Sequence, residues 1–281
     1  MSIDKGIGVF DSGIGGLTVL KEVIRLLPHE DTIYLGDTAR VPYGTKSAET
    51  VTRYSLEITD FLIKKGIKLL VVACNTASAV ALPALRERYK LPIIGVIEPG
   101  ARKAAAATKI KKVGVIGTEG TIKSGAYEKA IKAISPNIEV ISKPCPLFVP
   151  LAEEGWTDND VALAAAEIYL NDMKGVDTLV LGCTHYPLLK SAIASVMGEG
   201  VRLIDSGEET ALEVRWVLGK EGLLRVPLAP HGERVGVRGG LDMDSQGKRT
   251  FYVTDTPDRF IKVGLRFLGG GLEHAERVEI P

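Results

Sequence analysis

Short apolar runs alternate along the chain with longer stretches in which apolar residues recur at helical spacing. The apolar runs are predicted strands, at residues 7–10, 32–35, 69–73 and 93–97. Their continuous apolar character is typical of parallel strands that are covered on both faces. The stretches at 17–27 and 47–64 carry one apolar stripe each and are predicted helices. This alternation predicts right-handed crossovers and a doubly wound α/β sheet.

The same pattern then begins again. Residues 113–116 resemble 7–10, residues 178–183 resemble 69–74, and residues 201–207 resemble 94–100, all at a nearly constant offset. A period this long indicates repeated domains rather than a solenoid. We therefore expect an α/β fold of two similar doubly wound parallel-sheet domains related by pseudo-symmetry, with the active site in the cleft between them.

The predicted division of the chain is a first domain at 1–98, a second at 99–207, and a tail at 208–281 that returns to the first domain. The tail is expected to hold a helix at 210–218, a strand at 249–253 and a helix at 257–268, which has Pro257 in its first turn. Between them, the irregular stretch 226–248 is predicted to be a surface loop or hairpin.

The composition excludes several classes of protein. The chain has 281 residues, 45% of them hydrophobic, and its 35 Lys and Arg balance its 35 Asp and Glu. Zero net charge provides no long-range attraction to nucleic acid or to an anionic membrane. We expect no membrane span and no signal peptide. Three cysteines do not suggest a disulfide framework, so we expect a cytoplasmic protein with reduced thiols.

Polar residues follow the predicted strands at the edge where ligands bind in open parallel sheets. They are Asp11 and Ser12, Cys74 with Asn75 and Thr76, Thr118, and Cys183 with Thr184 and His185. Each repeat therefore places a cysteine at the same kind of position. If the two domains face each other, the two thiols lie on either side of one cleft.

Opposed thiols suggest acid–base chemistry at a carbon between them. A thiol whose pKa is lowered can exchange protons near neutral pH. Each cysteine precedes a predicted helix, at 77–89 and 187–196, and a helix N-terminus favours the thiolate. Two thiols on opposite faces of one carbon would invert a stereocentre. The alternative is that both are small buried core residues, which is our expectation for Cys145.

Other residues at this edge admit two interpretations each. Asp11 and Ser12 either bind a ligand ammonium group and anion or form a tight turn with Ser12 as a helix cap. Asn75, Thr76 and Thr184 either hold a carboxylate or cap helices, and His185 either handles protons or is structural. Tyr43 and Gly44 either close one wall of the cleft or form a surface turn.

Two further residue sets have a preferred interpretation. Glu153 and Glu154 are expected to cap or solvate a helix start, a functional role for Glu153 being the lesser alternative. A zinc site built from Cys74, Cys183 and His185 is also the lesser alternative, since no Cys-x-x-Cys pair or His cluster supports it, and we expect no metal.

Several segments, in order, resemble the signatures of the aspartate/glutamate racemase family, and of the glutamate racemases within it. They are residues 10–16 (FDSGIGG), 36–44 (GDTARVPYG), 73–77 (ACNTA), 145–150 (CPLFVP), 182–187 (GCTHYP) and 205–207 (DSG). The resemblance runs from about Ile7 to Leu218, and the tail at 251–268 is similar too.

The resemblance implies a cofactor-independent racemase that acts on glutamate. It implies that Cys74 and Cys183 are the proton donors and acceptors, Cys74 for the D and Cys183 for the L enantiomer. It further implies substrate binding by Asp11, Ser12, Tyr43, Gly44, Asn75, Thr76, Thr184 and His185. The His after Cys183-Thr184 argues for glutamate within the family. A homodimer and a role in D-glutamate supply for peptidoglycan, cell-wall biogenesis and cell shape in a bacterial cytoplasm are also implied.

Three alternatives remain open from the sequence. A racemase of the same class could act on aspartate or another acidic substrate. A non-catalytic two-domain protein could close on an amino acid, and its cysteines would then be dispensable. A pyridoxal-phosphate racemase fits poorly, because it needs a Schiff-base lysine and none lies in these motifs.

Overall fold

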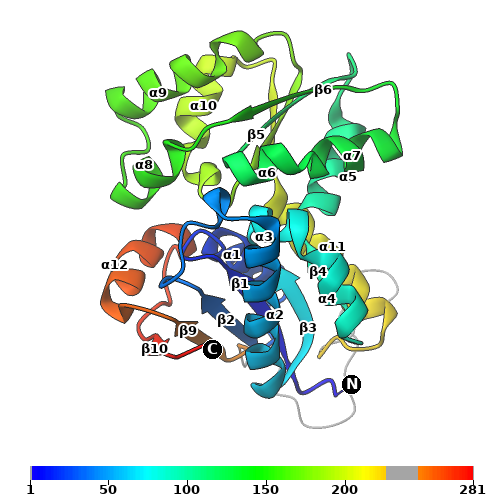
Figure 1. Ribbon diagram of the computed structural model, residues 1–281, viewed down its shortest axis with the longest axis vertical. Helices are drawn as coiled ribbons and strands as arrows, with labels where there is room; N and C mark the ends of the chain where they lie inside the picture. The colour runs from blue at the N-terminus through cyan, green and yellow to red at the C-terminus, as the bar shows by residue number, and fades with distance from the viewer. Residues whose placement is uncertain (1, 226–245, 281) are drawn as a thin grey trace.

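The computed structural model describes residues 2–225 and 246–280, and it has an α/β fold with two parallel sheets (Figure 1). Residues 226–245 of the predicted loop or hairpin lie outside the described residues. Within the described residues, no helix has both the length and the apolar character needed to cross a membrane.

All strand pairs in both sheets are parallel, as the buried apolar runs predict. The first sheet has the order β10-β9-β2-β1-β3-β4 and the second has the order β6-β5-β7-β8. The strands are β1 (Gly6–Asp11), β2 (Thr32–Gly36), β3 (Ile67–Val72), β4 (Ile93–Gly95), β5 (Lys112–Gly117), β6 (Glu139–Pro144), β7 (Thr178–Gly182), β8 (Arg202–Asp205), β9 (Arg249–Val253) and β10 (Glu276–Arg277). The order β2-β1-β3-β4 thus recurs as β6-β5-β7-β8, which is the repeat that the sequence predicts.

The central strands are buried on both faces because successive side chains point to opposite sides of the sheet. Ile7 and Val9 of β1 belong to one apolar cluster, and Phe10 belongs to another on the opposite face. In β3, Leu69 lies in the first cluster and Leu70 in the second. This arrangement explains why the predicted strands show continuous rather than alternating apolar runs.

Helices cover both faces of each sheet. Those around the first sheet are α1 (Leu17–Leu26), α2 (Ala48–Lys64), α3 (Asn75–Val80), α4 (Leu82–Arg88), α11 (Ser206–Lys220) and α12 (Pro257–Leu268). Those around the second are α5 (Ile97–Ala107), α6 (Glu119–Ser124), α7 (Ala126–Ile134), α8 (Phe148–Glu154), α9 (Asp160–Leu170) and α10 (Lys190–Met197). Short 3₁₀ turns lie between these elements, at η1 (Tyr43–Thr45), η2 (Asn171–Met173) and η3 (Tyr186–Leu189).

Three predicted elements have different bounds. The fourth strand ends at Gly95, and α5 begins at Ile97. The helix expected after Cys74 is divided into α3 and α4, because Pro83 in the first turn of α4 has no N–H to continue the hydrogen bonding of α3. The helix expected after Cys183 is the 3₁₀ turn η3 followed by α10.

The tail returns to the first sheet, where β9 pairs with β2 and β10 pairs with β9. Our division of the chain at 98/99 and 207/208 stays a prediction. Both points fall in the first turn of a helix, α5 and α11 respectively.

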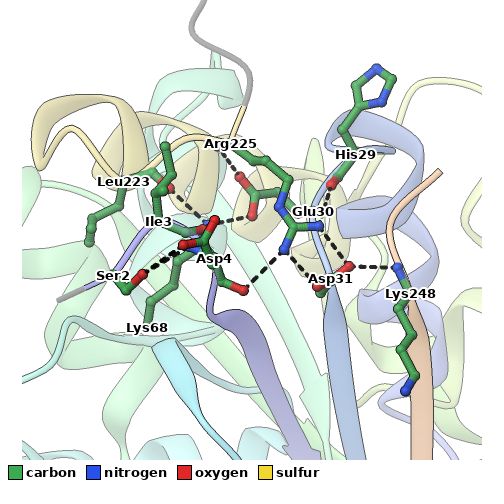
Figure 2. Close-up of polar contacts among 10 residues, drawn as sticks. All are labelled: Ser2, Ile3, Asp4, His29, Glu30, Asp31, Lys68, Leu223, Arg225 and Lys248. Atoms are coloured by element: carbon green, nitrogen blue, oxygen red, sulfur yellow. Dashed lines mark hydrogen bonds and ion pairs between the residues drawn. The ribbon is translucent and has the colours of Figure 1, made fainter. Parts of the chain in front are cut away.

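Charged side chains connect the segment around Arg225 to the edge where β2 and β3 begin (Figure 2). Lys68 of β3 is fully buried and its Nζ lies 2.6 Å from Oε2 of Glu30. Arg225, where the first described segment ends, pairs with Asp31 at 2.6 Å and donates its backbone N–H to Oε1 of Glu30. This edge of the sheet is the one opposite the predicted site.

Candidate active site

A cavity of about 260 Å³ lies between the two sheets at the carboxyl ends of their strands. Residues from both sheets line it, including Thr118 from the second. All the predicted site residues except Asp11 are among the lining residues, namely Ser12, Tyr43, Gly44, Cys74, Asn75, Thr76, Cys183, Thr184 and His185. The fold thus brings together side chains that are more than half the chain apart in sequence.

Cys74 lies at the end of β3 and immediately precedes α3. Its Sγ lies 3.6 Å from Oγ of Ser12, to which the thiol can donate. Burial and the neighbouring carboxylate of Asp11 raise the pKa of Cys74 to about 12, although hydrogen bonds from Ala77 N–H and Ser12 oppose the rise. The helix N-terminus therefore does not lower the pKa of Cys74, contrary to our expectation, because desolvation of the thiolate outweighs it.

Cys183 lies at the corresponding end of β7 and contacts His185. The Nδ1 of the imidazole is 3.9 Å from Sγ of Cys183, and its Nε2 is 3.1 Å from Oε1 of Glu153. Burial disfavours the imidazolium, but the hydrogen bonds to Cys183 and Glu153 outweigh burial and raise the pKa of His185 to about 10. The hydrogen bond from His185 lowers the pKa of Glu153. Cys183, His185 and Glu153 thus form a chain of proton-exchanging groups.

Asp11 lies behind the cavity wall rather than in it. Its Oδ2 accepts the N–H of Gly13 at 2.9 Å, and its Oδ1 is 3.5 Å from Oγ1 of Thr184. Complete burial raises the pKa of Asp11, and the charge of His185 opposes this rise. Its neighbour Ser12 lines the cavity but does not cap α1, whose N-cap residue is Gly16.

Asn75 and Thr76 begin α3, but neither caps it, since the N-cap position is occupied by Cys74. The Oδ1 of Asn75 accepts a hydrogen bond from the hydroxyl of Tyr127 at 2.7 Å. Its Nδ2 is buried, and no hydrogen-bond partner for it exists among the described residues. A buried amide without a partner costs free energy, so a ligand acceptor would satisfy it.

Hydroxyl groups link the two sheets at one wall of the cavity. The Oγ1 of Thr76 lies 2.9 Å from that of Thr118 and 3.2 Å from that of Thr121. On the opposite wall, Oγ1 of Thr18 donates to the backbone oxygen of Thr184 at 2.9 Å. These contacts hold Thr76 and Thr184 in place on both sides of the cavity.

Tyr43 and Gly44 form one wall, as one of the two interpretations predicts. The hydroxyl of Tyr43 donates to the buried carboxylate of Asp37, so this hydroxyl is already engaged. A Cβ at position 44 would lie 2.8 Å from Cβ of Thr118, so glycine allows this loop to meet the second sheet.

Glu153 is a lining residue that the sequence interpretation undervalued, whereas Thr118 was expected at this edge but was given no role. Glu153 does not lie at a helix start, because α8 ends at Glu154. The apolar pattern contains no signal for this, since the contact with His185 joins residues of different elements. Cys145 is buried and does not line the cavity. Within the described residues, no three or more His, Cys, Asp or Glu side chains are grouped so that they could hold a metal ion.

Comparisons with known proteins agree with this arrangement. The family model described as Asp/Glu/Hydantoin racemase matches residues 7–214. The glutamate racemase of Geobacter metallireducens is 60% identical over 278 residues, which cover 98% of this chain and 97% of that protein.

Solved structures of glutamate racemases also match. The isoform RacE1 of Bacillus anthracis aligns with a TM-score of 0.89 and 41% identity, covering 99% of this chain and 98% of its own. The enzyme of Francisella tularensis, solved in complex with D-glutamate, aligns with a TM-score of 0.86 and 39% identity, covering 99% and 98%. The chain belongs to the Asp/Glu/Hydantoin racemase family and is an amino-acid racemase, an isomerase.

Proposed function

We propose that this protein interconverts L- and D-glutamate, without a cofactor, by proton transfer between the α-carbon and two cysteines. The observation that carries the proposal is the placement of Cys74 and Cys183, from equivalent positions of two repeated sheets, on one cavity. Both thiols are free. Glutamate is the substrate because the relatives that match over nearly the whole chain are glutamate racemases, one of them solved with D-glutamate.

The reaction needs one proton removed and one returned on the opposite face. The thiolate of one cysteine takes the α-proton, so an S–H bond forms, the Cα–H bond breaks and the electron pair passes into the carboxylate system. The thiol of the other cysteine then gives its proton to the other face of Cα and becomes a thiolate. The enzyme ends with its two protonation states exchanged, and the next turnover runs from the other side or after proton exchange with solvent.

The surroundings of the two thiols differ. Cys183 has Nδ1 of His185 3.9 Å away, and Glu153 accepts from the other imidazole nitrogen. Cys74 has Ser12 as its polar neighbour, and the charge of Asp11 also acts on it. We assign Cys74 to the D enantiomer and Cys183 to the L enantiomer. A thiolate with a raised pKa is a stronger base, which suits a weakly acidic Cα–H bond once substrate has displaced water.

Substrate binding is assigned to the polar groups around the two thiols. The unpartnered Nδ2 of Asn75 and the hydroxyl of Thr76 suit a carboxylate, as do the polar groups of Ser12 and Thr184. The wall formed by Tyr43 and Gly44 bounds the cavity, and Asp11 acts from behind through Thr184.

The wider setting follows from the family. We propose that the enzyme supplies D-glutamate for peptidoglycan, and so serves cell-wall biogenesis and cell shape. We also propose a homodimer in the cytoplasm, for which the free thiols support a reducing compartment.

The test follows the α-proton of each glutamate enantiomer by NMR in D₂O, with chelator present, and follows inversion by circular dichroism. The wild type should lose the α-proton signal and invert both enantiomers, and aspartate should react far more slowly. Cys74→Ser and Cys183→Ser should each abolish inversion in both directions while glutamate still binds, because a hydroxyl is much less acidic than a thiol.

Cys145→Ser provides the matched control, since Cys145 is also buried and free but lies off the cavity. It should remain active. Full activity of either cavity variant would refute the two-cysteine scheme, and glutamate binding without α-proton exchange in the wild type would identify a binding protein instead.

A further inference from the structure

The helix α12, near the C-terminus, reaches α8 beside the second sheet (Figure 1). We propose that α12 is a positioning element for the reaction, in which Arg259 and Arg266 hold Glu153 so that it orients His185 toward Cys183. This inference rests on the proposed role of Cys183. It assigns a part in the reaction to a segment outside the family-matched residues 7–214.

Arg266 holds the backbone of Glu153. Its Nη1 donates to the carbonyl oxygen of Glu153 at 2.8 Å. This carbonyl belongs to the last turn of α8, where carbonyl groups have no partner within the helix. A Cβ on Gly155, which follows in a left-handed conformation with φ of 79°, would lie 2.9 Å from the same nitrogen. The end of α8 is therefore shaped to admit the guanidinium group.

Arg259 holds the side chain of the same residue. Its Nη2 lies 3.4 Å from Oε2 of Glu153, while Oε1 faces Nε2 of His185 at 3.1 Å. Because each carboxylate oxygen has its own partner, the plane of the carboxylate is defined. The positions of Arg259 and Arg266 are seven residues apart, which places both on one face of α12.

A third residue of α12 contacts the imidazole itself. The ring of Phe267 is buried and lies edge-to-face with the ring of His185, with 5.2 Å between centroids and 81° between planes. Position 267 follows Arg266 directly, so one turn of α12 contacts both members of the His185–Glu153 pair. Three contacts from α12 to the His185–Glu153 pair indicate that this helix holds both side chains in position.

The orientation matters for the proton transfer. Nε2–H donates to Glu153 while Nδ1 faces Cys183. Because the pKa of His185 is about 10, both ring nitrogens carry a proton near neutral pH, so Nδ1–H points toward Cys183 and favours its thiolate. If Glu153 moves, the imidazolium loses its partner at Nε2, so the ring can turn away from Cys183 and its pKa falls. Loss of the α12 contacts should therefore lower kcat more than it changes KM.

The test compares Arg259→Gln/Arg266→Gln with Lys262→Gln/Arg277→Gln, which removes the same charge from exposed positions of the tail that have no described contact with Glu153. We expect the first variant to lose kcat about 3- to 10-fold with KM within about 2-fold, since partly exposed contacts are individually weak. The control should retain wild-type kcat. Arg259→Lys/Arg266→Lys, which keeps both cations, should recover most of the loss.

A pH profile and NMR separate positioning from general stability. The groups facing Glu153 are His185, Arg259 and Arg266, with Cys183 and Asp11 beyond the imidazole. Removing the two cations should move the acid limb of kcat/KM to higher pH, because Glu153 then protonates more readily. The pH at which the ¹⁵N signals of His185 change, assigned with His185→Gln, should move to lower pH, because Glu153 then holds the imidazolium less firmly.

Unchanged kcat, pH profile and imidazole signals in the arginine variant would overturn the proposal. An equal loss in the control and the arginine variant would also overturn it, since the effect would then come from charge or folding. Cys183→Ser in the same assay separates this inference from the proposed function. If Cys183→Ser is active, the two-cysteine scheme fails; if it is inactive while the arginine variant is normal, only the role of α12 fails.

Discussion

The hydroxyl of Tyr127 in α7 donates to Oδ1 of Asn75 in α3 at 2.7 Å, so a helix beside the second sheet orients an amide at the end of the first sheet. This bond fixes which end of the amide is the acceptor, and it leaves the Nδ2 donor as the end without a partner among the described residues. Burial raises the pKa of Tyr127, so its proton is retained across the working pH range.

Tyr127→Phe should therefore weaken substrate binding more than turnover. Without the hydroxyl, the Asn75 amide is free to rotate, and its buried oxygen loses a partner at a cost of about 1–3 kcal/mol. We expect KM for both enantiomers to rise about 10-fold, with kcat within about 3-fold of the wild type. Steady-state kinetics in both directions measure this, and an unchanged KM would show that the bond does not orient a substrate contact.

Gly15 makes room for the residues that follow Cys183. A Cβ at position 15 would lie 2.3 Å from Oγ1 of Thr184 and 2.4 Å from Nδ1 of His185. Gly15→Ala should thus displace the imidazole and lower kcat/KM by at least about 10-fold, because small displacements in an active site are costly. Gly200→Ala, which adds its methyl group in open space, should behave as the wild type. Near-normal activity of Gly15→Ala would show that the ring position is not critical.

The fold and most of the cavity lining could be predicted because both depend on local patterns. Continuous apolar runs such as 69–73 predict doubly covered parallel strands, and parallel strands bring their carboxyl ends to one edge. Cys74 and Cys183 could be placed on facing walls once the repeat was recognised. Pro83 is a local sign that the helix after Cys74 divides into α3 and α4. The apolar spacing continues past Pro83, so the pattern alone predicts one helix.

The roles of Glu153 and α12 could not be predicted because they depend on packing between distant segments. Glu153 meets His185 from another element, and Arg266 meets Glu153 from a helix more than 100 residues further along the chain. Surface arginines on an amphipathic helix carry no local sign of such a contact. The pKa of Cys74 could not be predicted either, since its rise depends on burial between distant segments, which outweighs the helix N-terminus.

The raised pKa of His185 predicts a pH-dependent contribution to stability. Its pKa is about 10 in the folded protein, against 6.5 for the model value, because hydrogen bonds to Cys183 and Glu153 outweigh the effect of burial. The contribution is therefore fully present below about pH 6.5 and is lost as the pH rises through about 10. Urea unfolding of wild type and His185→Gln should show a free-energy difference that shrinks over this range. A constant difference would indicate that His185 is neutral in the folded state.

The buried ion pair at the far edge of the first sheet should control stability without changing catalysis (Figure 2). Lys68 Nζ pairs with Glu30 at 2.6 Å and donates to the carbonyl oxygens of Ile3 and Leu223, both at 2.8 Å. Lys68→Met would leave the Glu30 carboxylate buried without its cation, at a cost of about 3–5 kcal/mol. Denaturant unfolding should show this loss, and kcat of the folded protein should stay unchanged because Lys68 lies at the end of β3 opposite Cys74.

Lys68→Met/Glu30→Gln distinguishes the two sources of that cost. The double variant removes the buried charge and keeps a side-chain oxygen for the N–H of Arg225, which Glu30 accepts at 2.7 Å. It should therefore recover part of the lost stability. A double variant no more stable than Lys68→Met would place the cost in the carbonyl groups of Ile3 and Leu223. The ion pair would then serve mainly to hold the Lys68 ammonium where it joins the chain's first residues to the segment at Leu223.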